Sequence, residues 1–170
     1  MNTKIKVSRI VIALLLTVSA LGVSTSAALA DKPAKYEFSF SAYSELTDVC
    51  PFTVGIDIVG NVTAIDFFDN SGALIRSNWH LVEQDTFSAN GKSLAGIPYT
   101  VNLEWFYDSG GNVTSNIGVG VYEKVPLPDG SLFISAGRAD FVDHPGVNFL
   151  LSPDKGNSGN VEAFCAALAP

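Results

Sequence analysis

The chain has 170 residues, and its 17 acidic and 10 basic side chains give a formal net charge of −7. No basic stripe interrupts this acidic balance, which excludes nucleic acid as an expected partner, because phosphate binding relies on clustered Lys and Arg. The length fits one ordinary domain that can bury a real apolar core.

Residues 1–30 have the order of a secretory leader. Lys4, Lys6 and Arg9 precede an apolar run that begins at Ile10, and an A-x-A pattern ends at Ala30. We predict a signal peptide cleaved after Ala30, because the strongly apolar part is shorter than the roughly 20 residues of a membrane-spanning helix. The leader holds three of the ten basic residues and none of the seventeen acidic ones. The expected mature chain, residues 31–170, is therefore a secreted single domain without a membrane anchor, with a net charge of −10.

The chain contains two cysteines, Cys50 and Cys165. In an oxidising compartment an even cysteine count predicts a disulfide, and two cysteines allow one pairing. A bridge across about 115 residues contributes roughly 4 to 5 kcal/mol in the chain-entropy model. The alternative, a reactive or metal-binding thiol, lacks activating neighbours, since no C-x-x-C is present and the nearest imidazole is that of His144.

The mature chain begins with the period-two pattern of half-buried strands. Residues 36–46 alternate apolar and polar side chains, and residues 52–59 do so again after Pro51. The Gly-Asn pair at residues 60–61 has the composition of a turn. We therefore predict a hairpin in which residues 62–68 form the returning strand.

Turn clusters recur through the rest of the chain, and the segments between them are rich in β-branched and aromatic residues. They predict further strands at residues 73–87 (one long or two shorter strands), 99–107, 113–125 and 131–142. Gly118, Gly120 and Gly137 fall inside strand patterns and predict bulges or bends that help a sheet to curl. The expected fold is an all-β antiparallel barrel or barrel-like sheet of about eight to ten strands, with a β-sandwich as the alternative.

One segment near the C-terminus departs from the β pattern. Val161, Phe164, Cys165 and Leu168 follow the spacing of one helix face, with Ser158 or Asn160 available as the N-cap. The sequence therefore predicts a short helix that the disulfide pins against the start of an early strand. The residues before it, 152–160, are expected to be a flexible link.

The densest polar cluster comprises Arg138, Asp140, Asp143 and His144. If these side chains shared one face, they could bind a metal or perform acid–base chemistry. The Asp-His-Pro-Gly order at residues 143–146 favours the simpler interpretation of a polar turn.

Aromatic residues give the other functional signal. Trp105, Phe106 and Tyr107 are consecutive, so a strand must place rings on both of its faces. A second apolar face needs either a covering element or a ligand, and we take Trp79, His80, Trp105 and Tyr107 as the candidate ligand-facing residues. Alternation places Glu83 and Asp85 on the face opposite His80, as a solvated face or a pocket lining rather than a metal site. 

Signatures of enzymes are missing from the sequence. The nucleophile, zinc and phosphate-loop motifs G-x-S-x-G, H-E-x-x-H and G-x-x-x-x-G-K-[ST] do not occur. We therefore assign no catalytic residue, cofactor or metal. The leading hypothesis is a secreted non-catalytic β-barrel protein that binds a small apolar or amphipathic ligand. The alternatives are an interaction or inhibitor scaffold with an extracellular protein partner, and a lipocalin-like or cyclase-like enzyme that uses Asp140, Asp143 or His144.

The layout resembles that of small secreted bacterial β-rich proteins of unassigned function. The residues that carry the resemblance are the early Cys50-Pro51-Phe52, the glycine-punctuated strands and the closing Cys-Ala-Ala-Leu at residues 165–168. The resemblance implies a bacterial origin and an all-β fold, and it implies no catalytic residues. Asn61 and Asn112 stand in N-x-T patterns, which are glycosylation acceptors only in a host that glycosylates.

Overall fold

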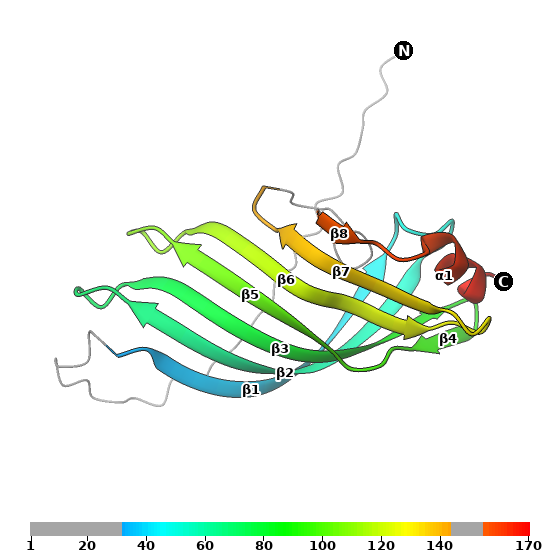
Figure 1. The fold of residues 1–170 in the computed structure, drawn as a ribbon, viewed down its shortest axis with the longest axis horizontal. Coiled ribbons are helices and arrows are strands. Elements are labelled where there is room, and N and C mark those ends of the chain that lie inside the picture. The colour runs from blue at the N-terminus through cyan, green and yellow to red at the C-terminus, as the bar shows by residue number, and fades with distance from the viewer. Residues whose placement is uncertain (1–31, 144–154) are drawn as a thin grey trace, which may run out of the picture.

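The computed structural model describes residues 32–143 and 155–170, and these form one antiparallel sheet and one helix (Figure 1). The predicted signal peptide and His144 lie outside the described residues. The elements are β1 (Ala34–Leu46), β2 (Val54–Phe68), β3 (Leu74–Ala89), β4 (Lys92–Ala95), β5 (Tyr99–Tyr107), β6 (Val113–Pro126), β7 (Leu132–Asp140), β8 (Lys155–Asn157) and α1 (Val161–Leu168).

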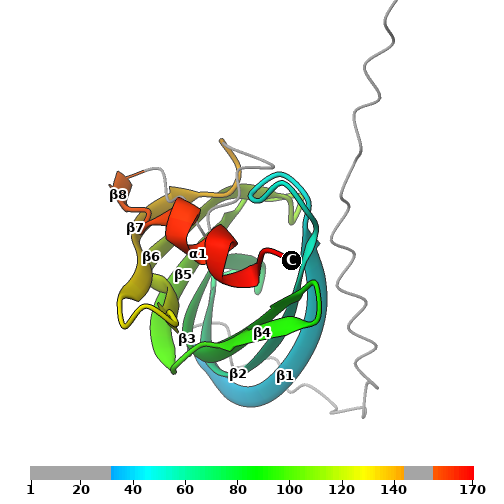
Figure 2. The same cartoon turned by 90° about the vertical axis from the view of Figure 1, so that its right-hand side faces the viewer.

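The sheet confirms the predicted fold class. Its strands follow the order β1-β2-β3-β5-β6-β7-β8, while the short β4 pairs with β3 beside this path. The sheet curls around one hollow side, the concave face, but within the described residues its edge strands β1 and β8 do not pair with each other (Figure 2). The fold is therefore barrel-like and open rather than a closed barrel.

The predicted hairpin at residues 60–61 is wrong. β2 runs straight through Gly60, which pairs with Phe40 on one side and with Glu83 on the other. A Cβ at Gly60 would come within 2.8 Å of the Phe40 ring, so the glycine makes room for an aromatic side chain rather than for a turn. The chain turns instead at Asp69, whose Oδ1 accepts hydrogen bonds from the backbone nitrogens of Ser71 and Ala73.

A β-bulge in β6 changes which side chains point inward. The register between β6 and β7 shifts between Val121 and Glu123. As a result two consecutive residues, Tyr122 and Glu123, are both buried, although plain alternation would place them on opposite faces. Without the bulge, Glu123 would face solvent.

The backbones of β7 and β8 approach each other closely at a pair of glycines. Gly137 and Gly156 are paired, and both have positive φ, 155° and 146°. A Cβ at Gly137 would lie 2.0 Å from the Lys155 carbonyl oxygen, so this close approach requires glycine. The predicted flexible link at residues 152–160 is wrong in part, because residues 155–157 form β8.

Helix α1 is confirmed, with Asn160 as its N-cap, where the side chain accepts a hydrogen bond from the Ala163 nitrogen at 3.0 Å. The helix lies across one end of the curled sheet, which we call the helix end (Figure 2). The predicted disulfide is present: Cys50 and Cys165 are bonded, and their Cα atoms are 5.5 Å apart.

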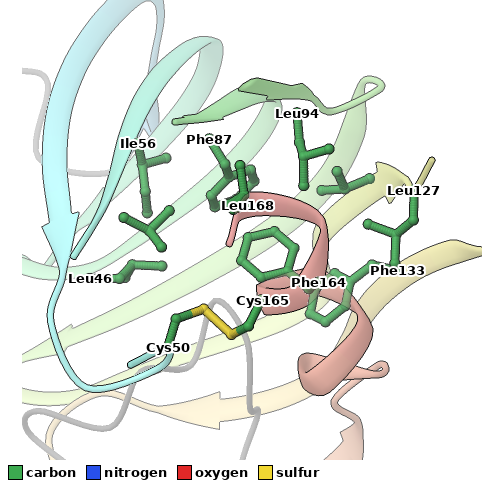
Figure 3. Packing of buried hydrophobic residues seen from close by; sticks show 12 residues of the cluster. Leu46, Cys50, Ile56, Phe87, Leu94, Leu127, Phe133, Phe164, Cys165 and Leu168 are labelled. Carbon is green, nitrogen blue, oxygen red and sulfur yellow. A yellow bond between two sulfur atoms is a disulfide. The ribbon is translucent and has the colours of Figure 1, made fainter. Parts of the chain in front are cut away.

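The helix end is filled by an apolar core (Figure 3). The Phe164 ring from α1 packs edge-on against Phe87 of β3, with centroids 5.0 Å apart, and against Phe133 of β7 at 5.1 Å. All three side chains are buried, and their burial holds the helix on the sheet. Other members of this core are Leu46, Val54, Ile56, Leu94, Val125, Leu127 and Leu168.

Candidate ligand site on the concave face

The end of the sheet opposite the helix end carries the β2–β3 and β5–β6 turns, and we call it the loop end (Figure 1). A group of aromatic side chains lies toward this end. Three ring pairs connect four of them: Tyr36 stacks on Phe38 at 6.1 Å, Phe38 meets Trp79 edge-on at 5.7 Å, and Trp79 lies 5.7 Å from Trp105. Tyr107 joins this group through its proximity to Tyr36. We call these five residues the aromatic site.

The strands bring these rings together through their register. Tyr36 of β1 stands opposite Ala64 of β2, which stands opposite Trp79 of β3 and thus Leu103 of β5. Residues in register across neighbouring strands point to the same face of a sheet. Because Ala64 is small and buried, the Tyr36 and Trp79 side chains rise on either side of it on the concave face.

A row of polar residues crosses the sheet next to the aromatic site. Asp66, Ser77, Trp105 and Asn116 are in register on β2, β3, β5 and β6. The Ser77 hydroxyl donates to Asp66, and the Trp79 indole nitrogen donates to the Ser77 oxygen at 2.9 Å. Partial burial and then the neighbouring Asp66 raise the pKa of Tyr107. This end of the concave face is therefore both aromatic and polar.

Two buried polar atoms in this row have no partner. Trp105 Nε1 and Asn116 Oδ1 are both shielded from solvent, and neither makes a hydrogen bond to another residue that the structure describes. Asn116 is only 8% exposed. Leaving a buried polar group unpaired costs about 1 to 3 kcal/mol, so such atoms are uncommon in folded proteins unless something else satisfies them.

A second polar group, the carboxyl cluster, lies deeper on the same face. Its members are Glu83 and Asp85 of β3, Tyr99 of β5 and Glu123 of β6. The Tyr99 hydroxyl is 3.0 Å from Glu83 Oε2 and 2.9 Å from Asp85 Oδ2. Asp85 and Glu123 are 1% and 0% exposed, which is exceptional for carboxyl groups.

Burial governs the protonation of this cluster. It raises the pKa of Glu83 to about 7, and it raises the pKa of Glu123 well above the ordinary value, with the nearby Asp85 adding to the effect. Burial, and then the charge of the nearby Asp85, thus favour the neutral, protonated form of Glu123. Burial thus favours the neutral form of all three carboxyl groups of the cluster. Within residues 32–143 and 155–170, no group of His, Cys, Asp or Glu is arranged to hold a metal.

An apolar band separates the two polar groups. Trp79 and Glu83 belong to the same strand, and four residues of strand span about 13 Å. Leu81 lies between them, and the buried Val62 and Val101 flank it in register on β2 and β5. The concave face thus runs from the aromatic site, across an aliphatic band, to the carboxyl cluster and the core at the helix end.

The four candidate ligand-facing residues divide between the two faces of the sheet. Trp79, Trp105 and Tyr107 belong to the aromatic site on the concave face. His80 does not: it is exposed on the convex face, where its Nδ1 lies 2.8 Å from Asn102 Oδ1. Adjacent residues of a strand point to opposite faces, so Trp79 and His80 cannot share a site.

The polar cluster at the end of β7 has the geometry of a turn. Asp140 Oδ1 accepts hydrogen bonds from the backbone nitrogens of Val142 and Asp143, at 3.2 and 3.1 Å. Arg138 lies 3.6 Å from Asp140 Oδ2, and its side chain is 43% exposed. These contacts match the turn interpretation; the fourth predicted member, His144, lies outside the described residues.

Two shallow grooves lie on the convex face. The first, of about 330 Å³, is lined by both aliphatic and polar side chains, among them Ile65, His80, Glu104 and Val119. The second, of about 340 Å³, runs along β1, β2 and β3 beside Val59 and Val82. Asn78, which also lines the first groove, has a buried Oδ1 without a hydrogen-bond partner among the described residues.

Several residues of these two groups were not predicted from the sequence. Glu83 and Asp85 were placed on one face, but the burial of Asp85 was not predicted, although Leu81 and Phe87 on that face mark it as a core face. Glu123 could not be found, since only the bulge turns it inward. Tyr36 and Phe38 were visible as the apolar side of a strand, without a sign that they meet Trp79.

No family model, curated protein or solved structure matches the chain. The described residues contain no helix that is long and apolar enough to cross a membrane.

Proposed function

We propose that the protein is a secreted, non-catalytic binding protein that holds a small amphipathic ligand at the aromatic site on its concave face. The single observation that carries this proposal is the pairing of aromatic rings with buried polar atoms that lack partners, Trp105 Nε1 and Asn116 Oδ1. Ligand sites in proteins combine an apolar, aromatic lining with a few placed polar groups, which is the composition found here.

The architecture supports the same function. Rings from β1, β3 and β5 converge although they are distant in sequence, and the core at the helix end fixes the strands that carry them. Sites built on strands of a rigid scaffold hold their geometry better than sites on loops. The aliphatic band beside Leu81 would receive the apolar body of a ligand whose ring lies at Trp79.

Export is the second part of the proposal. The disulfide between Cys50 and Cys165 suits an oxidising compartment, and the leader sequence at residues 1–30 supplies the route. Intact mass spectrometry of the protein from culture medium should give the mass of residues 31–170 less two hydrogens. A mass that retains residues 1–30, or free thiols, would contradict export of an oxidised mature chain.

Binding is tested with Nile red, a neutral ring dye whose emission rises in apolar surroundings. The chain has two tryptophans, and both lie in the aromatic site, so energy transfer from tryptophan to the dye reports this site directly. We expect saturable transfer in the wild type. In Trp79→Ala we expect at least tenfold weaker binding, because the ring at the centre of the site is lost.

The matched control is Val119→Ala, which trims an apolar side chain that is 50% exposed and lines a convex groove. This variant should bind the dye as the wild type does. The proposal would be overturned if Trp79→Ala bound the dye as the wild type does and Val119→Ala bound it more weakly. That result would place the site on the convex face. Both variants must first show cooperative melting.

A further inference from the structure

We infer that the ligand presents a neutral hydroxyl group, carried on a ring, to Trp105 Nε1 and Asn116 Oδ1. This inference rests on the proposed function and names the chemistry that the same site selects. Trp105 and Asn116 stand directly opposite each other on β5 and β6, so their side chains leave the concave face from neighbouring points.

The two unpaired atoms need opposite hydrogen-bond partners, because one is a donor and the other is an acceptor. The indole Nε1–H is a donor only, whereas the amide Oδ1 is an acceptor. A hydroxyl oxygen accepts one hydrogen bond and donates another, so a single atom satisfies both. An ammonium group offers no acceptor to Trp105, and a carboxylate offers no donor to Asn116.

The acidic side chain of Asp66, in the same row of residues as Trp105 and Asn116, also disfavours an anionic ligand. Asp66 stands two strands away from Trp105, and it already accepts the Ser77 hydroxyl. A carboxylate or phosphate ligand would have to approach this acidic side chain in a protein whose overall charge is also negative. A fatty acid is therefore a poor fit, and a phenol or an alicyclic alcohol is a good one.

The remaining surfaces of the site select a ring. Trp79 and Phe38 meet edge to face, and the planes of Trp79 and Trp105 are tilted by 48°, so aromatic rings surround the indole that carries the unpaired donor. Aromatic rings gain from stacked and edge-on contacts beyond the area that they bury. A flexible chain would lose more conformational entropy for the same contact.

The test compares four probes on the same naphthalene body: 2-naphthol, 2-methylnaphthalene, 2-naphthoate and 2-naphthylmethylamine. Quenching of tryptophan fluorescence in the wild-type protein gives each affinity. We expect 2-naphthol to bind about tenfold tighter than the methyl analogue, which has a similar shape but makes no hydrogen bonds. The anionic and cationic probes should bind more weakly than 2-naphthol.

Two variants assign the preference to the two atoms. Trp105→Phe keeps a ring but removes the donor, and Asn116→Leu keeps the volume but removes the acceptor. Each should weaken 2-naphthol binding about fivefold and leave 2-methylnaphthalene unchanged, and Trp79 still reports binding in both. Trp79→Phe is the control, since it should weaken both probes equally.

The outcomes separate the inference from the proposed function. If neither the dye nor any naphthalene probe binds, the proposed function fails. If 2-naphthol and 2-methylnaphthalene bind equally, or if 2-naphthoate binds best, the inference is overturned while the concave site stands. A naphthol preference that survives both Trp105→Phe and Asn116→Leu would also overturn it.

Discussion

The helix end and the loop end of the same sheet differ in how they treat the concave face. At the helix end α1 covers it, the disulfide fastens the helix, and Phe164 packs on Phe87 and Phe133. At the loop end the face carries rings beside two buried polar atoms, Trp105 Nε1 and Asn116 Oδ1, that have no hydrogen-bond partner among residues 32–143 and 155–170. At the helix end, the buried apolar side chains stabilise the fold. At the loop end, two polar atoms can still form hydrogen bonds with a ligand.

The carboxyl cluster marks the boundary between these two regions. Buried carboxyls are costly in a core whose only task is stability, because each must be protonated or paired. Here the Tyr99 hydroxyl lies within hydrogen-bond distance of Glu83 and Asp85, and burial raises the pKa of Glu123. We therefore expect the stability of this fold and its ligand binding to respond to different mutations and to different conditions.

We expect the largest loss of stability when the disulfide at the helix end is removed. Replacing both cysteines, Cys50→Ser with Cys165→Ser, should lower the free energy of unfolding by about 4 to 5 kcal/mol, because the bridge closes a loop of about 115 residues. Urea denaturation of the variant and of the oxidised wild type measures the difference. A loss below about 1 kcal/mol would mean that the helix end does not depend on its bridge.

A second substitution compares the two ends directly. Phe164→Ala removes a side chain that is 0% exposed and should cost about 3 to 5 kcal/mol of unfolding free energy. Trp105→Phe, at the loop end, should cost less than about 1.5 kcal/mol, since it keeps a ring and removes a donor that has no partner. Equal losses of unfolding free energy in urea titrations would contradict the view that the helix end contributes more to stability than the loop end.

The boundary is tested by pH. Glu83, Asp85 and Glu123 bind protons more tightly in the folded than in the unfolded protein, because burial raises the pKa of each. Stability is therefore full below about pH 4 for these groups and falls as the pH rises through about 7, the raised pKa of Glu83. Glu83 alone should account for about 3 kcal/mol of this loss.

Thermal melting between pH 4 and pH 8 measures this dependence in the wild type and in Glu83→Gln, which keeps an acceptor for Tyr99. The variant should have a flatter profile. Glu37→Gln, on an exposed strand position, is the control and should keep the wild-type slope. A wild type that gains stability steadily from pH 4 to pH 8 would contradict the proton-holding cluster.

The smallest effect concerns the start of α1. Asn160→Ala removes the side chain that accepts from the Ala163 nitrogen and should cost about 1 kcal/mol. Asn160→Asp, which can cap equally well, should restore most of the loss. Neither change should alter dye binding at the loop end; a parallel loss of binding would show that the two ends are energetically coupled.

Much of the fold could be predicted from the sequence because its signals are local. The alternation in residues 36–46 and the apolar spacing from Val161 to Leu168 correspond to β1 and α1. The turn assigned to Gly60 failed because glycine serves two purposes, and here it makes room for Phe40. Composition cannot tell a turn glycine from one that a ring covers.

The candidate site could be predicted only in part. Trp79, Trp105 and Tyr107 were identified as surplus aromatic residues, yet their meeting with Tyr36 and Phe38 depends on a strand register that no local pattern contains. His80 was included because it neighbours Trp79, and alternation separates the two. An unpaired buried atom such as Asn116 Oδ1 can be recognised only in the three-dimensional structure, because its lack of a hydrogen-bond partner depends on all of its spatial neighbours.

The most direct test of the central claim is a crystal structure of the wild-type protein with 2-naphthol bound. We expect the naphthalene ring to lie against Trp79 on the concave face, with its hydroxyl oxygen about 3 Å from both Trp105 Nε1 and Asn116 Oδ1. A ligand seated in the convex groove beside His80 and Val119, with the aromatic site empty, would contradict it.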